Sequence, residues 1–487
     1  MKMSRIQLKD AELLRQQALF GGRWQDAHAG ATLPVIDPST QQQIATIPAL
    51  GAAETEQAID YAESVRASWG KTPNASRAAL LDKWHQLILD NADDLAIIMT
   101  AEQGKPLAEA KGEVLYGASF VKWFAEEARR IYGDTIPAPS EDRRILVLKQ
   151  PVGVAAAITP WNFPIAMITR KVAPALAAGC PIIVKPSELT PLSALALAVL
   201  AERAGFPSGV LQVLTGLPTE IGSTLTASRT VRKISFTGST RVGQLLMQQS
   251  ADSIKRLSLE LGGNAPLIVF DDADLDITIP GVMASKFRNA GQTCVCANRI
   301  LVQRGIYERF SEKLLEAVAT LKVGDGFAPG STIGPLINER AVEKVNSHID
   351  DALRQGATLL RGGISTPNGT FVEPTILGNV TSSMRIAHEE TFGPVAPLFV
   401  FDSEEEAIQM ANDTPYGLGA YFFTENIRRA WRVAESLEFG MVGFNTGAIS
   451  LDAAPFGGIK LSGLGREGSR YGIEEYLEQK TFHIGSL

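Results

Sequence analysis

The sequence predicts an α/β protein whose sheets are largely parallel, and three observations support that fold class. First, apolar segments of strand length alternate with segments of helical periodicity between residues 154 and 260. Second, a similar alternation starts at residue 267. Third, 487 residues without an internal repeat suffice for about three domains. Strands that alternate with helices of this length imply right-handed crossovers and parallel sheets.

The expected elements follow from local periodicity, taken in chain order. Apolar residues recur at helical spacing through 52–127, as at Ala58, Ala62 and Val65, which predicts helices there. In the first alternation we expect strands at 154–158, 182–184, 210–214, 233–236 and 256–260, and helices at 165–178, 192–204, 220–227 and 242–250. In the second we expect strands at 267–270, 299–302 and 394–401, and helices through 283–289, 307–321 and 339–355. An isolated strand at 145–150 could pair with the end of the 466–487 tail.

Composition and charge argue against several classes of function. Lys plus Arg number 46 against 53 Asp plus Glu, so no basic excess exists to neutralise a nucleic-acid backbone. The N-terminus lacks the apolar core of a secretory signal, and prolines interrupt the longest uncharged stretch, so no membrane association is expected. Three cysteines cannot build a disulfide framework, which favours the cytoplasm. The 5 scattered histidines argue against a metal site, and the absence of GxSxG argues against a serine hydrolase.

Parallel sheets bind ligands beyond the carboxyl ends of their strands, so functional residues are expected directly after each strand. Asn162 follows the first strand, where its amide could stabilise an oxyanion or simply form a turn. Lys185 and Glu188 follow the second and could hold ribose hydroxyls or form a surface ion pair. From these residue types alone, the ordinary structural roles are favoured.

Three further segments carry candidate residues. The turn 238–243 after the fourth strand could bring backbone amides to a phosphate, although its GxxxxG spacing also fits a capped glycine turn. Glu260 ends the fifth strand, where partial desolvation would raise its pKa and suit it to act as a general base. The alternative is a solvated carboxylate at the end of a strand. Cys294 and Cys296 lie in a Gly-Gln-Thr loop that is poorly suited to core packing, so a thiolate nucleophile is plausible.

Taken together, these segments resemble the aldehyde dehydrogenase superfamily. The resemblance rests on PWNFP, KPSE, FTGST, ELGGNAP, GQTCVC, EETFGP and PFGGIKLSGLGREG, which occur in order along nearly the whole chain. Within the superfamily the chain is most similar to bacterial succinate-semialdehyde dehydrogenases, through AMITRK, EQGKPLAEAKGE, AEEARRIYGDTIP and FRNAGQTCVCANR. The resemblance implies an aldehyde dehydrogenase-like fold with a Rossmann-like cofactor domain.

That fold implies the domain boundaries. We expect an NAD(P)-binding domain at 1–131 and 152–262, a catalytic domain at 263–465, and a small β oligomerisation element at 132–151 and 466–487. The last two segments include the isolated strand and the tail described above. Members of the superfamily are usually assemblies, so a homodimer or homotetramer is implied.

The resemblance also assigns catalytic roles. Cys294 corresponds to the nucleophile that attacks the aldehyde, and the Asn162 amide would hold the oxyanion. Glu260 corresponds to the base that activates water to hydrolyse the thioester, which implies that the product is a free acid. The implied reaction is oxidation of succinate semialdehyde to succinate, with NAD or NADP as cofactor.

Cofactor contacts are assigned in the same way. Lys185 and Glu188 would bind the adenosine ribose, and Glu390 would position the nicotinamide ribose. The remaining predicted contacts, to the pyrophosphate and around the nicotinamide ring, are Gly238, Ser239, Gly243, Phe392 and Trp161. Several bacterial succinate-semialdehyde dehydrogenases have serine at the Glu188 position and prefer NADP. A carboxylate there should repel a 2′-phosphate, so we expect NAD to be preferred.

The implied substrate is a small semialdehyde with a remote carboxylate. Arg170, Arg288 and Ser450 match the residues that bind this group in the resembling enzymes. Cys296, two residues after the nucleophile, could form a reversible disulfide with it or could be a packed small residue. Glutarate semialdehyde and 2,5-dioxopentanoate are alternative substrates; a non-catalytic structural or binding member and a cofactor-free thiol esterase or peptidase are alternatives of other classes.

Overall fold

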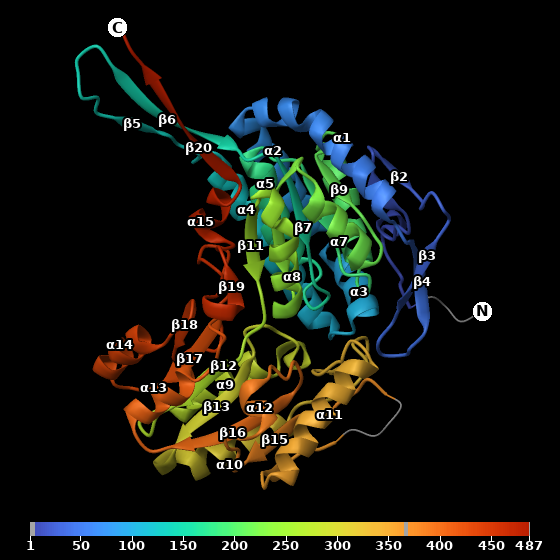
Figure 1. The fold of residues 1–487 in the computed structure, drawn as a ribbon. Helices are drawn as coiled ribbons and strands as arrows, with labels where there is room; N and C mark the ends of the chain where they lie inside the picture. The colour runs from blue at the N-terminus through green and yellow to red at the C-terminus, as the bar shows by residue number, and fades with distance from the viewer. Residues whose placement is uncertain (1–4, 365–368, 487) are drawn as a thin grey trace.

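An eight-stranded sheet forms the centre of the upper body in Figure 1, in the order β19-β11-β10-β7-β8-β9-β1-β2. This is a computed structural model, which describes residues 5–364 and 369–486. The strands of the sheet are β1 (Ala18–Phe20), β2 (Arg23–Gln25), β7 (Val154–Ile158), β8 (Ile182–Lys185), β9 (Leu211–Val213), β10 (Val231–Thr237), β11 (Arg256–Glu260) and β19 (Gly463–Leu464). Strands β7 to β11 are mutually parallel, and β1, β2 and β19 extend the two edges in antiparallel pairings.

The strand order reverses at β7. The chain moves from β7 to β8 and β9 on one side, then returns to place β10 on the other side of β7. At such a reversal the connections leave the carboxyl edge in opposite directions and open a crevice between them. The crevice therefore lies beside the segments that follow β7 and β10.

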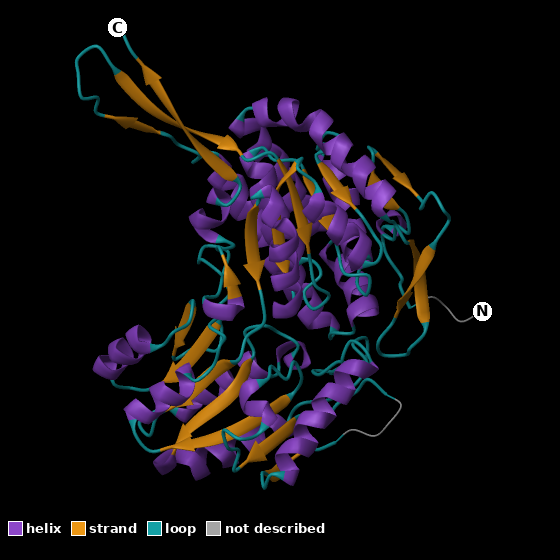
Figure 2. Ribbon diagram, in the orientation of Figure 1, coloured by secondary structure: helices purple, strands orange, loops and turns teal. Residues whose placement is uncertain are grey.

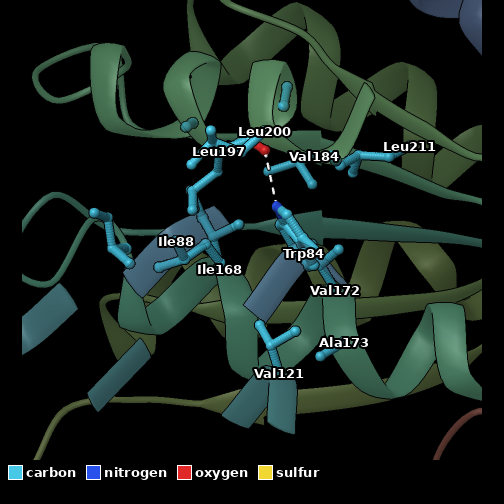
Figure 3. Packing of buried hydrophobic residues seen from close by; sticks show 14 of the residues in the cluster. Trp84, Ile88, Val121, Ile168, Val172, Ala173, Val184, Leu197, Leu200 and Leu211 are labelled. Atoms are coloured by element: carbon cyan, nitrogen blue, oxygen red, sulfur yellow. Dashed lines mark hydrogen bonds between the residues drawn. The ribbon is translucent and has the colours of Figure 1, made fainter. Parts of the chain in front are cut away.

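Helices cover both faces of this sheet (Figure 2). They are η1 (Ala11–Leu13), α1 (Ala52–Lys71), α2 (Asn74–Asp90), α3 (Ala92–Gln103), α4 (Leu107–Ala128), α5 (Ala166–Ala178), α6 (Leu192–Ala204), α7 (Pro218–Ala227), α8 (Thr240–Ser250) and η2 (Ala251–Ser253). Figure 3 shows the packing on one face, where Trp84 lies among aliphatic side chains and donates its indole N–H to the Leu197 carbonyl at 3.1 Å. This bond satisfies the polar atom of a large side chain that has no solvent exposure.

A seven-stranded sheet forms the lower body of Figure 1, in the order β14-β15-β16-β13-β12-β17-β18. Its strands are β12 (Ala265–Val269), β13 (Ala297–Gln303), β14 (Thr358–Arg361), β15 (Thr375–Gly378), β16 (Val395–Phe401), β17 (Gly419–Phe423) and β18 (Met441–Phe444). The associated helices are α9 (Leu275–Lys286), η3 (Arg288–Gly291), η4 (Arg304–Ile306), α10 (Tyr307–Ala319), α11 (Glu339–Arg354), α12 (Arg385–His388), α13 (Glu404–Asn412), α14 (Ile427–Ser436) and η5 (Lys460–Ser462). All of its pairings are parallel except that of β14 with β15.

A three-stranded arm projects from the first body and carries the C-terminal strand (Figure 1). It consists of β5 (Asp134–Ile136), β6 (Arg144–Pro151) and β20 (Leu477–Ile484), and β20 follows α15 (Ser469–Glu474). β20 pairs antiparallel with β6 from Leu477↔Pro151 to Ile484↔Arg144. The expected pairing of the isolated strand with the tail is therefore confirmed.

Most expected elements are present, and the differences have local causes. β7, β11 and α6 have the expected bounds. The helix expected through residue 289 ends at Lys286, because Asn289 and Ala290 adopt left-handed φ values of 51° and 54°. Short strands at the N-terminus, among them β1, β2, β3 (Thr32–Ile36) and β4 (Gln43–Pro48), were not anticipated, since long-range pairing such as Leu19↔Val213 stabilises them more than their own pattern does.

β19, at the end of the segment expected to belong to the catalytic domain, pairs with β11 in the first sheet. Among the helices of the described residues, none combines the length and the hydropathy needed to cross a bilayer.

Candidate active site

A cleft of about 280 Å³ opens where the carboxyl edge of the first sheet faces the second body. Segments that follow β7, β10 and β11 line it, together with loops of the second body. The predicted site residues on its wall are Trp161, Asn162, Gly238, Ser239, Glu260, Cys294, Glu390 and Phe392. Residues up to 231 positions apart in the sequence thus meet at the strand-order reversal (Trp161 to Phe392).

Cys294 is half-buried on the wall of this cleft, in the loop between η3 and β13. Its carbonyl closely approaches Gly263, where an added Cβ would lie 2.5 Å from the oxygen, so only glycine fits there. Burial raises the pKa of the Cys294 thiol to about 12, against the opposing charge of Arg170. Without a ligand, the thiol is therefore protonated near neutral pH, and a nucleophilic role requires its proton to be removed.

Asn162 lies beside the Cys294 loop and is held by several hydrogen bonds. Its side-chain nitrogen donates to the Gln292 carbonyl at 3.0 Å, which leaves one N–H of the amide for another acceptor. Its main-chain carbonyl accepts from Lys105 Nζ at 2.8 Å and from Asn289 Nδ2 at 3.0 Å. The residue is 5% exposed and lines the cleft. A fixed, desolvated amide of this kind can stabilise a developing oxyanion.

Glu260 ends β11 with its carboxyl group in the cleft wall, only 1% exposed. Neither carboxyl oxygen accepts a hydrogen bond from a described residue. Burial raises its pKa well above the usual value, and the nearby Glu467 carboxylate acts in the same direction. The alternative of a solvated strand-end carboxylate is therefore wrong, and the group has the desolvated environment that suits a general base.

A buried ion-pair cluster near Glu260 was not anticipated from the sequence. Glu467 pairs with both Arg170 and Lys171 and accepts from the Ser235 hydroxyl at 3.1 Å. Burial alone would raise the pKa of Glu467, but the two cations outweigh burial and lower it. The sequence offered one sign of this cluster, namely two adjacent charges inside the otherwise apolar helix α5.

The aromatic and acidic residues predicted around a nicotinamide lie together on the cleft wall. Trp161 and Phe392 meet edge to face, with ring centroids 5.6 Å apart. Glu390 accepts from the Gly263 N–H at 3.2 Å, and burial raises its pKa to about 7. An added Cβ at Gly262 would lie 3.3 Å from Glu390, so the glycine leaves room for the carboxyl group.

Of the other predicted cofactor residues, Gly238 and Ser239 line the cleft, whereas Lys185, Glu188 and Gly243 are not among the residues of its wall. Ser239 caps the N-terminus of α8 by accepting from Val242 N at 3.4 Å, beside Gly238 in the cleft wall. Such a helix start presents backbone N–H groups to a phosphate. Lys185 is buried and pairs with the half-exposed Glu188 at 2.9 Å, rather than lying on the surface. Gly243 packs on Leu261, where an added Cβ would lie 2.5 Å away.

A second, smaller cavity of about 30 Å³ lies on the other side of the nucleophile loop. Thr293 and Val295, the two neighbours of Cys294, line it together with Arg288 and Ser450. Arg288 is exposed, its guanidinium carbon lies 5.1 Å from the Phe163 ring centre, and no described carboxylate forms an ion pair with it. This cavity therefore offers an uncommitted cation close to Cys294.

Arg170 occupies a different environment from Arg288. It is 1% exposed, pairs with Glu467, and lies over the Phe456 ring at 4.2 Å. Tyr116 was not anticipated. Burial raises the pKa of its phenol, and Arg170, Arg288 and Ser450 are all close enough to lower it. The three predicted substrate residues thus lie near the phenol of Tyr116, which α4 contributes.

The remaining cysteines are unpaired. Cys296 is buried and its thiol contacts the Lys286 carbonyl at 3.4 Å. Cys180 is fully buried in the first core. Among the described residues, no group of three or more His, Cys, Asp or Glu side chains is placed to hold a metal ion.

Comparison with known proteins finds relatives that match nearly the whole chain. The sequence model of the aldehyde dehydrogenase family matches residues 24–482. The chain is 59% identical over 483 residues to a 3-sulfolactaldehyde dehydrogenase of Pseudomonas putida, which covers 99% of each protein. It is 59% identical to a glutarate-semialdehyde dehydrogenase of Pseudomonas putida, over 98% of this chain and 100% of that protein. It is 57% identical to an NADP(+) succinate-semialdehyde dehydrogenase of Escherichia coli, over 99% and 100%.

Solved structures confirm the fold class. A succinate-semialdehyde dehydrogenase from Burkholderia pseudomallei matches with a TM-score of 0.97 and 59% identity, over 98% of this chain and 99% of that one. A betaine aldehyde dehydrogenase from Staphylococcus aureus, solved with NAD+, matches with a TM-score of 0.94 and 36% identity, over 97% and 95%.

Proposed function

Because the chain belongs to the aldehyde dehydrogenase family, we propose that it oxidises succinate semialdehyde to succinate with a nicotinamide cofactor. One observation carries the substrate assignment. The unpaired Arg288 guanidinium shares a cavity with Ser450, and both neighbours of Cys294 line that cavity. An arginine fork binds a carboxylate bidentately, so a short aldehyde that bears a remote carboxylate would reach from Arg288 to the thiol.

The proposed first step is attack of Cys294 Sγ on the aldehyde carbon, with the thiol proton passing to water in the cleft. The carbonyl oxygen becomes the oxyanion of a thiohemiacetal. The free N–H of the Asn162 amide and the main-chain N–H of Cys294 would stabilise this charge. Because Asn162 is fixed before the substrate arrives, little reorganisation is needed as the charge develops.

The proposed second step leaves an acyl group on Cys294 as a thioester. When bound, NAD or NADP supplies the acceptor for the hydride that leaves the thiohemiacetal carbon. The residues that would hold the cofactor are Trp161, Lys185, Glu188, Gly238, Ser239, Gly243, Glu390 and Phe392. The glycine-flanked N-terminus of α8 and the aromatic wall of the cleft fit this group.

The proposed last step is hydrolysis of the thioester. Glu260 takes a proton from water, the hydroxide adds to the acyl carbon, and the carbon–sulfur bond breaks to give the carboxylic acid and the Cys294 thiolate. The proton of the acid then passes to the thiolate, so the carboxylate and the Cys294 thiol result, and Glu260 returns its proton to solvent. A buried carboxyl group without hydrogen-bond partners is a strong base once it is deprotonated, which supports this role.

Replacing Arg288 by Ala tests the substrate assignment. We expect KM for succinate semialdehyde to rise about 10- to 100-fold, because a charged hydrogen bond to the carboxylate is lost. KM for a neutral aldehyde such as propanal should change little. Steady-state kinetics with both aldehydes measures the difference, and Arg309→Ala, on the exposed face of α10, serves as the matched control.

The same kinetics separates the related substrates. Equal effects of Arg288→Ala on anionic and neutral aldehydes would contradict the assignment. A higher kcat/KM for glutarate semialdehyde, 2,5-dioxopentanoate or 3-sulfolactaldehyde than for succinate semialdehyde would leave the role of Arg288 as the anion-binding residue in place. It would identify that compound, instead of succinate semialdehyde, as the substrate. Of the three compounds, the first and last are supported by what the two Pseudomonas putida relatives are named for.

The Glu188 carboxylate supports a preference for NAD over NADP. It lies beside the buried Lys185, where a 2′-phosphate on the adenosine ribose would meet a negative charge. We expect Glu188→Ser to lower KM for NADP at least about tenfold and to raise KM for NAD. Initial rates with each cofactor measure this; a wild-type KM that is lower for NADP than for NAD would refute the preference.

Assembly and location are further parts of the proposal. Apolar side chains are exposed on the arm at Ile136, Leu148 and Phe482, which supports a homodimer or homotetramer joined through 132–151 and 466–487. The boundaries 1–131 with 152–262 for the cofactor domain and 263–465 for the catalytic domain belong to the same proposal. Three unpaired cysteines fit a cytoplasmic enzyme, and reversible pairing of Cys296 with Cys294 stays a prediction.

A further inference from the structure

The segment 162–166 leads from the proposed oxyanion amide into α5, and a buried ion pair holds it at both ends. Lys105 Nζ donates to the main-chain carbonyl of Asn162 at 2.8 Å and pairs with Glu113. The other carboxyl oxygen of Glu113 accepts from the main-chain N–H groups of Ile165 at 2.9 Å and Ala166 at 3.2 Å. The Lys105 and Glu113 side chains are each 1% exposed.

The middle of this segment is also fixed by Lys105. The ammonium nitrogen lies 4.1 Å from the centre of the Phe163 ring, and the Arg288 guanidinium lies near the same ring. Cations are attracted to aromatic rings at such distances. One ammonium group therefore contacts the residue that would hold the oxyanion and also the ring beside the residue that would hold the carboxylate.

A second contact secures the Asn162 carbonyl and links it to the nucleophile loop. Asn289 Nδ2 donates to this carbonyl, and Gln103 Nε2 donates to Asn289 Oδ1 at 3.0 Å. Gln103 Oε1 in turn accepts from the Lys105 main-chain N–H at 2.9 Å. Loss of the Lys105 ammonium would leave the carbonyl held from one side only and would leave the Glu113 carboxylate buried without its cation.

We propose that Lys105, paired with Glu113, is a positioning residue that orients the side-chain amide of Asn162 toward the oxyanion. This inference rests on the role of Asn162 in the proposed function. The orientation of a side chain depends on the orientation of its own peptide, and a displacement of about 1 Å at a reacting group can reduce a rate about 10²-fold. The effect of Lys105 on catalysis should therefore pass through Asn162.

A double-mutant cycle on kcat tests this route. Lys105→Met keeps the unbranched chain up to the position of Cε and removes the ammonium donors; we expect kcat to fall about 10- to 100-fold. Asn162→Ala should lower kcat about 10²- to 10³-fold. In the double variant we expect kcat to lie within about twofold of that of Asn162→Ala alone. Once the Asn162 amide has been removed, loss of Lys105 can no longer displace it and should lower kcat no further. Lys111→Met, which changes an exposed lysine of α4, the helix that carries Glu113, is the matched control.

Each outcome of the cycle decides a different point. Additive losses in the double variant would overturn the positioning role while the proposed function stands. A wild-type kcat in Asn162→Ala would defeat the oxyanion role itself, and this inference with it. Thermal melting and binding of the cofactor check that the variants fold. If Lys105→Met does not fold, Glu113→Gln enters the same cycle, with non-additivity expected and additivity again contradicting the proposal.

Discussion

Glu260→Gln is expected to release one equivalent of reduced cofactor per site rapidly and then to turn over only slowly. The substitution keeps the shape of the side chain but removes the basic oxygen that would activate water. General-base catalysis contributes about 10²- to 10⁴-fold, so kcat should fall by about 10³-fold. The rapid first phase should persist, because attack by Cys294 and hydride loss precede the step in which Glu260 acts. Stopped-flow absorbance of the reduced cofactor measures both phases.

The pH dependence of the wild-type protein provides a second check on Glu260. Burial raises the pKa of this carboxyl group well above its usual value. Only the deprotonated form accepts a proton, so the slow phase should lose rate as the pH falls through that raised pKa. Glu260→Gln should show no such fall in its residual turnover. A variant whose fast phase disappears together with turnover would instead place Glu260 at the attack on the aldehyde.

Cys294→Ala is expected to abolish the oxidation of every aldehyde. No other described nucleophile on the cleft wall is placed as Cys294 is, beside both the Asn162 amide and the Arg288 cavity. Removing a nucleophile that forms a covalent intermediate lowers kcat on the order of 10⁴- to 10⁶-fold. Neither a burst nor steady turnover should remain, although binding of the cofactor should persist.

Cys296→Ser is the matched control for that loss. Its thiol contacts the Lys286 carbonyl and does not line the cleft, so most of kcat should be retained. Comparable losses in the two variants would show that the loop is sensitive to any substitution and would remove the support for Cys294 as the nucleophile. Hydrolysis of an ester by the wild-type protein without cofactor would support the thiol as nucleophile. If the same protein did not oxidise aldehydes, the oxidation proposed here would be contradicted.

Much of the fold could be predicted because local pattern and tertiary structure agree. Strand β7 is an uninterrupted apolar run followed by Thr159, and β8 and β11 end in the charged residues Lys185 and Glu260. Apolar runs such as that of β7 are typical of buried parallel strands. Rules of handedness then place the polar residues on one edge of the sheet. Asn162 and Glu260 are therefore predictable from the sequence as candidate site residues.

The parts that could not be predicted depend on long-range contacts. Arg170 and Glu467 are 297 positions apart, and only the folded chain shows that the arginine is already paired. Tyr116 lies in a helix whose amphipathic pattern explains it equally well as a packing residue. The strand β1 consists of three residues, and its pairing with β9 at Leu19↔Val213 leaves no periodic signal in the sequence. In each case, a partner distant in the chain decides the role of the residue.

The most direct test of the account is to trap the acyl group on Cys294. Glu260→Gln, mixed with succinate semialdehyde and cofactor and quenched in acid after the burst, should carry a succinyl group on the peptide that contains Cys294. Peptide mass spectrometry should find it there in an amount equal to the burst. A burst of reduced cofactor without any acyl group on Cys294 would contradict the thioester route.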